Sequence, residues 1–235
     1  MSNTVTIIIY SSAAGFPIFI GGLISSVFQM KDYKHKKVVN HFITAFGGGA
    51  LLSAISFVLI PQAVTDMNLI EMIPIFLAGT IAFMFLDILS NKIGGSIAQV
   101  LSMMMDFIPE ALALGASFAV NHSFGLLIAL FIGLQNLPEG FNSYIELSTK
   151  LKKQKILLLL FALSFVGIFS ALTGEFLLSK HDNIVDSIML FSGGGILYLI
   201  FQDIAPISKL ENNWLPATGA SMGFLVGMIG EKLLN

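Results

Sequence analysis

The chain has 235 residues, of which 55% are hydrophobic and only 11% are charged, and its formal net charge at pH 7 is −2. Because about 25% of the residues of a typical soluble domain are charged, this composition excludes a soluble globular protein and predicts a membrane protein. The absence of cysteine excludes disulfides and thiolate metal sites, and every basic residue is a lysine, so we expect no nucleic-acid partner.

The apolar segments predict eight transmembrane helices, because a bilayer core requires about 20 mostly apolar residues per helix. In chain order they cover residues 5–29, 40–61, 70–90, 96–119, 123–147, 155–178, 184–206 and 215–233. The first segment is too long for the core of a signal peptide, so we expect it to be retained. The short loops predict a single all-α transmembrane domain over residues 1–235, in contact with the lipid bilayer.

The lysines predict the orientation of these spans. If the N-terminus is external, ten of the twelve lysines fall on the internal side, and only Lys180 and Lys232 fall on the external side. Lysine is enriched in cytosolic loops, so both termini are expected on the non-cytosolic side. We expect an integral, multi-pass protein of the plasma membrane.

A weak internal repeat relates the second and seventh spans. Residues 48–52 (Gly-Gly-Ala-Leu-Leu), followed by Pro61, can be laid on residues 193–197 (Gly-Gly-Gly-Ile-Leu), followed by Pro206, at a constant offset of 145. The two spans would cross the bilayer in opposite directions. This pattern predicts a 3+2+3 arrangement with an inverted repeat, which is typical of secondary transporters.

The fourth and fifth spans each contain a Pro-Glu pair within an apolar run. In the fourth span, polar or small residues at Asp106, Glu110, Ala113 and Ser117 are three or four positions apart and therefore share one helix face. In the fifth span the narrow polar face consists of Gln135, Asn136, Glu139, Asn142, Ser143 and Glu146. Each proline would also free a backbone carbonyl one turn earlier.

Four acids lie within predicted spans, namely Asp106, Glu110, Glu139 and Glu175. An ionised carboxylate at the bilayer centre costs about 2.5–3.5 kcal/mol on insertion scales. No lysine lies mid-span, so protons or metal ions must supply the compensating charge. We expect a site that holds protons when empty and releases some of them when a divalent cation binds. The uncharged residues Ser117, Asn142 and Ser143 are more readily explained by hydrogen bonds between helices.

These motifs resemble the ZIP (zinc/iron-regulated-like) family of metal transporters, in which both central helices carry a motif close to His-Asn-x-Pro-Glu-Gly. The fifth span retains Asn136, Pro138, Glu139 and Gly140, and the fourth retains Pro109 and Glu110. The resemblance implies eight spans, external termini and a binuclear metal site between spans four and five. The residues that it implies along the metal path are Asp106, Glu110, Gln135, Asn136, Glu139 and Glu175.

The chain departs from the family pattern at the site itself. Asp106 and Gln135 replace the two motif histidines, Phe107 replaces an asparagine, and Ala111 replaces a glycine. Loss of imidazole favours oxygen ligands, which suit Mn²⁺, Fe²⁺, Mg²⁺ or Ca²⁺ relatively better, although Zn²⁺ also accepts carboxylates. We expect a divalent metal ion (zinc, manganese or iron) as the substrate and no prosthetic group.

The leading prediction is therefore a transporter that moves divalent metal ions into the cytosol, and not an enzyme. The loss of both histidines leaves open a non-transporting metal sensor or structural homologue. Two acids on different helices could also serve an intramembrane aspartyl protease, although the expected Gly-x-Gly-Asp setting is absent.

Two further features have alternative interpretations. Gly219, Gly223 and Gly227 would permit close helix contact, either inside the protein or in a homodimer. Asp87 and Asp203 lie near cytosolic span ends, either at an exit from the site or solvated at the membrane interface.

Overall fold

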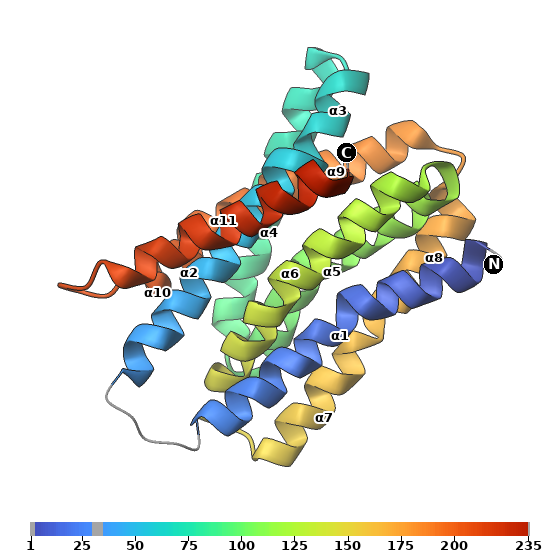
Figure 1. Ribbon diagram of the computed structural model, residues 1–235. Coiled ribbons are helices and arrows are strands. Elements are labelled where there is room, and N and C mark those ends of the chain that lie inside the picture. The colour runs from blue at the N-terminus through green and yellow to red at the C-terminus, as the bar shows by residue number, and fades with distance from the viewer. Residues whose placement is uncertain (1–2, 30–34, 235) are drawn as a thin grey trace.

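The computed structural model describes residues 3–29 and 35–234, apart from the side chains of residues 95–97, 99, 102, 119, 120 and 182 (Figure 1). Lys31 and Lys34, two of the lysines assigned to the cytosolic side, lie outside the described residues. The described chain is almost entirely helical and contains no strand, so the predicted all-α class is confirmed.

The helices follow the predicted spans closely. They are α1 (Asn3–Gln29), α2 (Lys36–Ala54), α3 (Ile60–Asp66), α4 (Leu69–Ile93), α5 (Gly95–Val120), α6 (His122–Leu147), α7 (Lys153–Ser164), α8 (Val166–Leu178), α9 (Asp182–Leu199), α10 (Ala205–Ser208) and α11 (Leu215–Leu234). Two π-helical turns, η1 (Ile55–Leu59) and η2 (Ile200–Ile204), connect α2 to α3 and α9 to α10.

Within the described residues, six helical stretches are long and apolar enough to cross a membrane. They are α1, α2 with α3, α4, α6, α7 with α8, and α9 with α10. The remaining two predicted spans form α5, of 26 residues, and α11, of 20 residues. The structure thus supports a multi-pass membrane protein, while the number of eight spans and the 3+2+3 arrangement stay predictions.

Local signals explain where the central helices begin. The side chain of Asn68 accepts hydrogen bonds from the backbone of Ile70 and Glu71 at the start of α4, and Asn121 caps the start of α6 in the same way. Between α4 and α5, Gly94 adopts φ 63°, a conformation that disfavours residues with a Cβ. This glycine reverses the chain directly, so that α5 packs against α4.

The two π turns lie at the same offset as the sequence repeat. Ile55 and Ile200, which begin them, are 145 residues apart, and so are Leu59 and Ile204, which end them. Each turn is followed two residues later by a proline, Pro61 or Pro206. Because proline crowds the carbonyl one turn earlier, widening the helix at that point relieves the clash.

Each π turn packs against a glycine of the other repeat. A Cβ on Gly48 of α2 would lie 2.8 Å from Cγ2 of Ile204, and a Cβ on Gly193 of α9 would lie 3.8 Å from Cβ of Leu59. Gly48 and Gly193 are again 145 residues apart. The contacts are therefore reciprocal, because η2 packs on α2 and η1 packs on α9.

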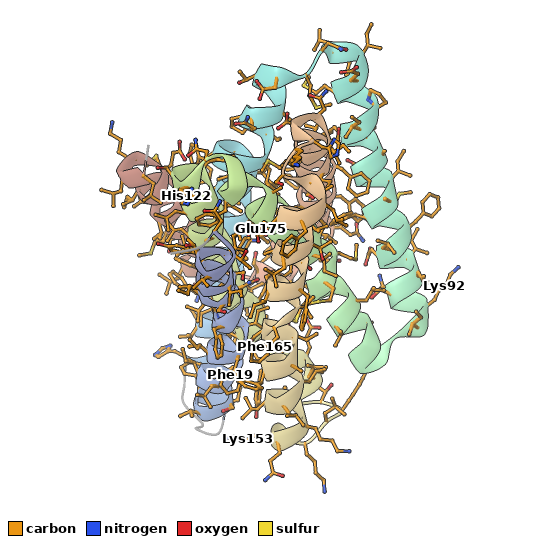
Figure 2. All side chains as sticks on the ribbon, turned by 90° about the vertical axis from the view of Figure 1, so that its right-hand side faces the viewer. Phe19, Lys92, His122, Lys153, Phe165 and Glu175 are labelled. Carbon is orange, nitrogen blue, oxygen red and sulfur yellow. The ribbon has the colours of Figure 1, made fainter. Side chains whose placement is uncertain are left out.

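The helices associate in two groups. In the first group α1 packs on α6 and α5 packs on α8; in the second α11 packs on α2 and α4 packs on α9 (Figure 1). Phenylalanines join α1 to α7 and to Phe165, which lies between α7 and α8. The ring centroids of Phe16 and Phe165 are 5.8 Å apart, and those of Phe19 and Phe161 are 5.3 Å apart. Phe19 and Phe165 are labelled in Figure 2. The two groups meet mainly where α2 contacts α6 and where α5 contacts α9.

The glycine ladder of α11 is used for internal packing. A Cβ on Gly219 or Gly223 would collide with the backbone carbonyl of Phe42 or Phe46 in α2, and one on Gly227 would collide with Ser53. Of the two interpretations of this ladder, the structure therefore places it inside the protein, and a homodimer stays a prediction.

Candidate metal centre

Four of the six predicted site residues form one cluster between α5 and α6. Asp106, Glu110 and Gln135 are buried, with 3%, 2% and 1% of their surfaces exposed, and Glu139 is half-buried. Nε2 of Gln135 donates a hydrogen bond to Oε2 of Glu110. The carboxyl groups of Asp106 and Glu139 contact each other, and both interact with Glu110. The side-chain oxygens of these four residues thus lie together between α5 and α6 and do not face separate lipid-facing surfaces.

Several buried oxygens of the predicted site residues have no hydrogen-bond partner within the described chain. They are Oε1 of Glu110, Oε1 of Gln135, Oδ1 of Asn136, Oε2 of Glu139 and Oε2 of Glu175, and we call them the unpartnered oxygens. A buried polar atom without a partner typically costs about 1–3 kcal/mol. Carboxylate and amide oxygens are the ligands that hard divalent cations prefer. The donor chemistry therefore fits a cation.

The cluster is not a closed ligand shell. Among the described residues, no group of three or more His, Cys, Asp or Glu side chains is placed so that it could hold a metal ion. The cluster combines two acids of α5 with one acid and one amide of α6. Its carboxylate groups alone therefore do not form a complete ligand shell for a metal ion. Its residues fit a metal ion by their chemistry, and their role as ligands stays a prediction.

Asn136 and Glu175 lie apart from the cluster, on the side of α1. Nδ2 of Asn136 donates to the carbonyl of Ala14, at 2.8 Å, and Oε1 of Glu175 accepts from Oγ1 of Thr4, at 3.2 Å. Thr4 precedes Ala14 by ten residues, which corresponds to about 15 Å along a helix. Glu175 therefore lies at another level of the molecule, toward the end where His122 lies and away from Lys153 (Figure 2).

A cavity of about 460 Å³ extends from the cluster toward one end of the helices, and Asp106 and Glu139 form part of its wall. Further polar residues also line it: Asn40, His41 and Thr44 of α2, Asp87, Ser90 and Asn91 of α4, Asn142, Ser143 and Glu146 of α6, and Asp203 of η2. These residues lie near the helix ends next to Lys36, Lys92, Lys150 and Lys209. The cavity thus approaches the side of the protein that the lysines predict to be cytosolic.

The cavity gives Asn142, Ser143 and Glu146 a position that the sequence interpretation did not assign to them. Oγ1 of Thr44 donates to Oδ1 of Asn142 at 3.0 Å, and Oγ of Ser143 donates to Sδ of Met103 at 2.9 Å. Asn142 and Ser143 do bond neighbouring helices, as expected, but they also line the cavity. The signal was present in the sequence, because Glu139, Asn142 or Ser143, and Glu146 continue one face of α6.

Asp87 is a buried acid of the cavity wall rather than a solvated surface residue. Only 8% of its surface is exposed, and its two oxygens accept hydrogen bonds from Nδ2 of Asn91, at 3.0 Å, and from the hydroxyl of Tyr198, at 3.1 Å. The interpretation of Asp87 as an acid solvated at the interface is therefore wrong. The bond from Tyr198 joins α4 to α9 beside the cavity.

Comparison with known proteins gives one partial similarity. The chain is 31% identical over 148 residues to the zinc transporter GufA of Myxococcus xanthus, and the match covers 62% of this chain. It spans 58% of the length of that relative. No family model matches the chain.

Proposed function

We propose that the chain is a multi-pass membrane transporter of divalent metal ions, with Asp106, Glu110, Gln135 and Glu139 as its central binding residues. The observation that carries the proposal is that Glu110, Gln135 and Glu139 have unpartnered oxygens and belong to a cluster whose Asp106 and Glu139 line an acidic cavity. The similarity to a zinc transporter supports metal ions as the substrate class.

The proposed direction of transport is into the cytosol. An ion leaving the cluster would pass the carboxylates and amides of the cavity, including Asn142, Glu146 and Asp203, which can replace the cluster oxygens stepwise. The acids also give the cavity a negative field, which attracts cations. The lysine-bearing helix ends beside the cavity support its opening to the cytosol.

The proposed substrate is a metal ion that accepts oxygen ligands. The imidazole of His41 lies in the wall of the adjoining cavity, whereas the four cluster residues offer carboxylate and amide oxygens. Mn²⁺ and Fe²⁺ accept such ligands, and Zn²⁺ does so without its preferred nitrogen or sulfur. We therefore propose Mn²⁺ or Fe²⁺ ahead of Zn²⁺ as the transported ion.

The decisive experiment measures uptake of Mn²⁺, Fe²⁺, Zn²⁺, Cd²⁺, Mg²⁺ and Ca²⁺ into proteoliposomes containing the full chain. Glu139→Ala should abolish uptake, because it removes an acid that contacts Asp106. Glu71→Gln, which changes an exposed acid in the first turn of α4, is the matched control and should retain uptake. Equal uptake by the native protein and Glu139→Ala would contradict the proposal.

The same experiment separates the alternatives. A metal sensor would bind the ion in detergent and give no uptake in any liposome. The contact between Asp106 and Glu139 is the one observation that favours acid catalysis, since two carboxyl groups must share a proton in such enzymes. If the native protein cleaves a helical peptide and Asp106→Asn does not, the result would support an intramembrane aspartyl protease instead.

A further inference from the structure

Trp214 is the only tryptophan of the chain, and 81% of its surface is exposed. A buried tryptophan side chain removes about 150–250 Å² from water, so an indole ring that stays in water forgoes a large stabilisation. The helices of the chain do not supply this burial. A contact outside the chain would supply it.

The turn that carries Trp214 is held by its own hydrogen bonds. Leu210 and Asn213 form an antiparallel bridge, in which the backbone N–H of Asn213 donates to the carbonyl of Leu210 at 3.2 Å. Asn212, between them, has φ 56°, a conformation that asparagine adopts more readily than most residues. Oδ1 of Asn213 accepts a hydrogen bond from the backbone of Leu215, at 3.0 Å. The backbone is therefore fixed on both sides of Trp214.

The packing of α11 on α2 shows how the two helices are aligned. A Cβ on Gly219 would collide with the backbone carbonyl of Phe42, and a Cβ on Gly223 would collide with that of Phe46. Residue numbers thus increase together along both helices. The start of α11 consequently lies beside the start of α2.

This alignment places Trp214 near the level of two lysines. Trp214 precedes Gly219 by five residues, as Lys37 precedes Phe42, so the indole lies at about the level of Lys37. Lys209 belongs to the same turn as Trp214, and both lysines are exposed. Figure 1 shows this turn in red at one end of the helices, ahead of α11. The indole therefore lies where the apolar helices end and charged residues begin.

The surroundings of Trp214 match the layers of a phospholipid. Leu215, the next residue and the first of α11, is apolar and more than half exposed, whereas Lys209 on the other side of the turn is charged. Acyl chains, ester carbonyls and phosphates follow one another in the same order across a leaflet. Tryptophan is enriched at this boundary, because its ring is apolar and its N–H is a hydrogen-bond donor.

We propose that Trp214 and its turn bind the headgroup and glycerol layer of the phospholipid leaflet at the lysine-bearing end of the protein. The ring lies beside the first carbons of the acyl chains, its N–H donates to an ester or phosphate oxygen, and Lys209 lies close to the phosphates. The proposal requires only that the chain spans a membrane, and it does not rest on the transport of metal ions.

The test measures the fluorescence of the native full chain in phosphatidylcholine vesicles, where the signal comes from Trp214 alone. The acyl chains carry bromine, which quenches indole on contact, either close to the headgroup or near the chain end. Shallow bromine should quench Trp214 more strongly than deep bromine does. The reference is the double variant Trp214→Phe with Phe169→Trp, because Phe169 is exposed near the middle of the stretch Lys153–Leu178. This variant should show the opposite order.

Three results would overturn the proposal. Quenching by acrylamide in the water without quenching by either bromine would place the indole in water. Stronger quenching by deep bromine would place it in the hydrocarbon core. Resistance to all quenchers that is lost when the protein is diluted with lipid would place it against a second copy of the chain. The result on the native protein stands even if the double variant does not fold.

Discussion

The amide of Gln135 donates a hydrogen bond to the carboxylate of Glu110, which joins the two helices of the candidate metal centre. This bond occupies Oε2 of Glu110 and leaves Oε1 of both residues without a partner in the described structure. The same contact therefore holds both Oε1 atoms in place, and Gln135 orients Glu110.

Gln135→His should change which metal ion is preferred. The imidazole would add a nitrogen ligand to a site of oxygens, and nitrogen favours Zn²⁺ over Mn²⁺. We expect the ratio of zinc uptake to manganese uptake to rise about tenfold, equivalent to about 1.4 kcal/mol. Competition uptake in proteoliposomes measures this ratio. An unchanged ratio would exclude Gln135 from the ligands.

Metal binding should weaken as the pH falls. Carboxyl groups bind a metal ion only after they lose their protons, so protons compete with the ion for Asp106, Glu110 and Glu139. The apparent affinity for Mn²⁺ should therefore be higher at pH 7.5 than at pH 5.5. Calorimetric titration in buffers of different ionisation enthalpy should detect proton release on binding. Heats that do not depend on the buffer would contradict this expectation.

Gly223→Ala should destabilise the protein. The added Cβ would collide with the backbone carbonyl of Phe46 and force α11 away from α2, and overpacking of this kind costs about 1–3 kcal/mol. Gly133→Ala is the matched control, because its Cβ would meet its nearest neighbour at 3.6 Å, an ordinary contact. Thermal unfolding in detergent should show a lower midpoint for Gly223→Ala alone.

Tyr198→Phe should weaken the packing of α4 against α9. The change removes the hydroxyl that donates to Oδ2 of Asp87, and a hydrogen bond to a charged group contributes about 1.5–3 kcal/mol. The thermal midpoint should fall, and the fall should be smaller in the Asp87→Asn background, because an amide oxygen accepts a weaker hydrogen bond than a carboxylate. Tyr10→Phe, which keeps the ring stacked on Phe118, is the control.

Much of the helical fold and of the candidate metal centre could be predicted from the amino-acid sequence. Apolar runs located the helices, because burial in lipid requires such runs, and the spacing of Asp106 and Glu110 placed both acids on one face of α5. The polar residues of α6 were predicted with the same argument. Because exposing acids to lipid is costly, the polar faces of α5 and α6 were expected to face each other.

Other features depend on tertiary contacts that have no local signal. Asn136 is adjacent to Gln135 in sequence, yet its amide turns to Ala14 because the carbonyl of α1 lies within reach. Glu175 was grouped with the other acids because it also lies within a predicted span, although its carboxylate accepts a hydrogen bond from Thr4 at another level of the molecule. The cavity wall combines α2, α4, α6 and η2, and no periodicity within one helix predicts such a combination.

The reciprocal contacts of Gly48 with Ile204 and of Gly193 with Leu59 tie the evolution of one half of the chain to that of the other. A residue inserted into or deleted from either π turn would rotate the proline and everything after it, and would withdraw a side chain from the opposite half at the same time. Compensation would require a matching change about 145 residues away. The length of one turn can therefore change only together with the length of the other.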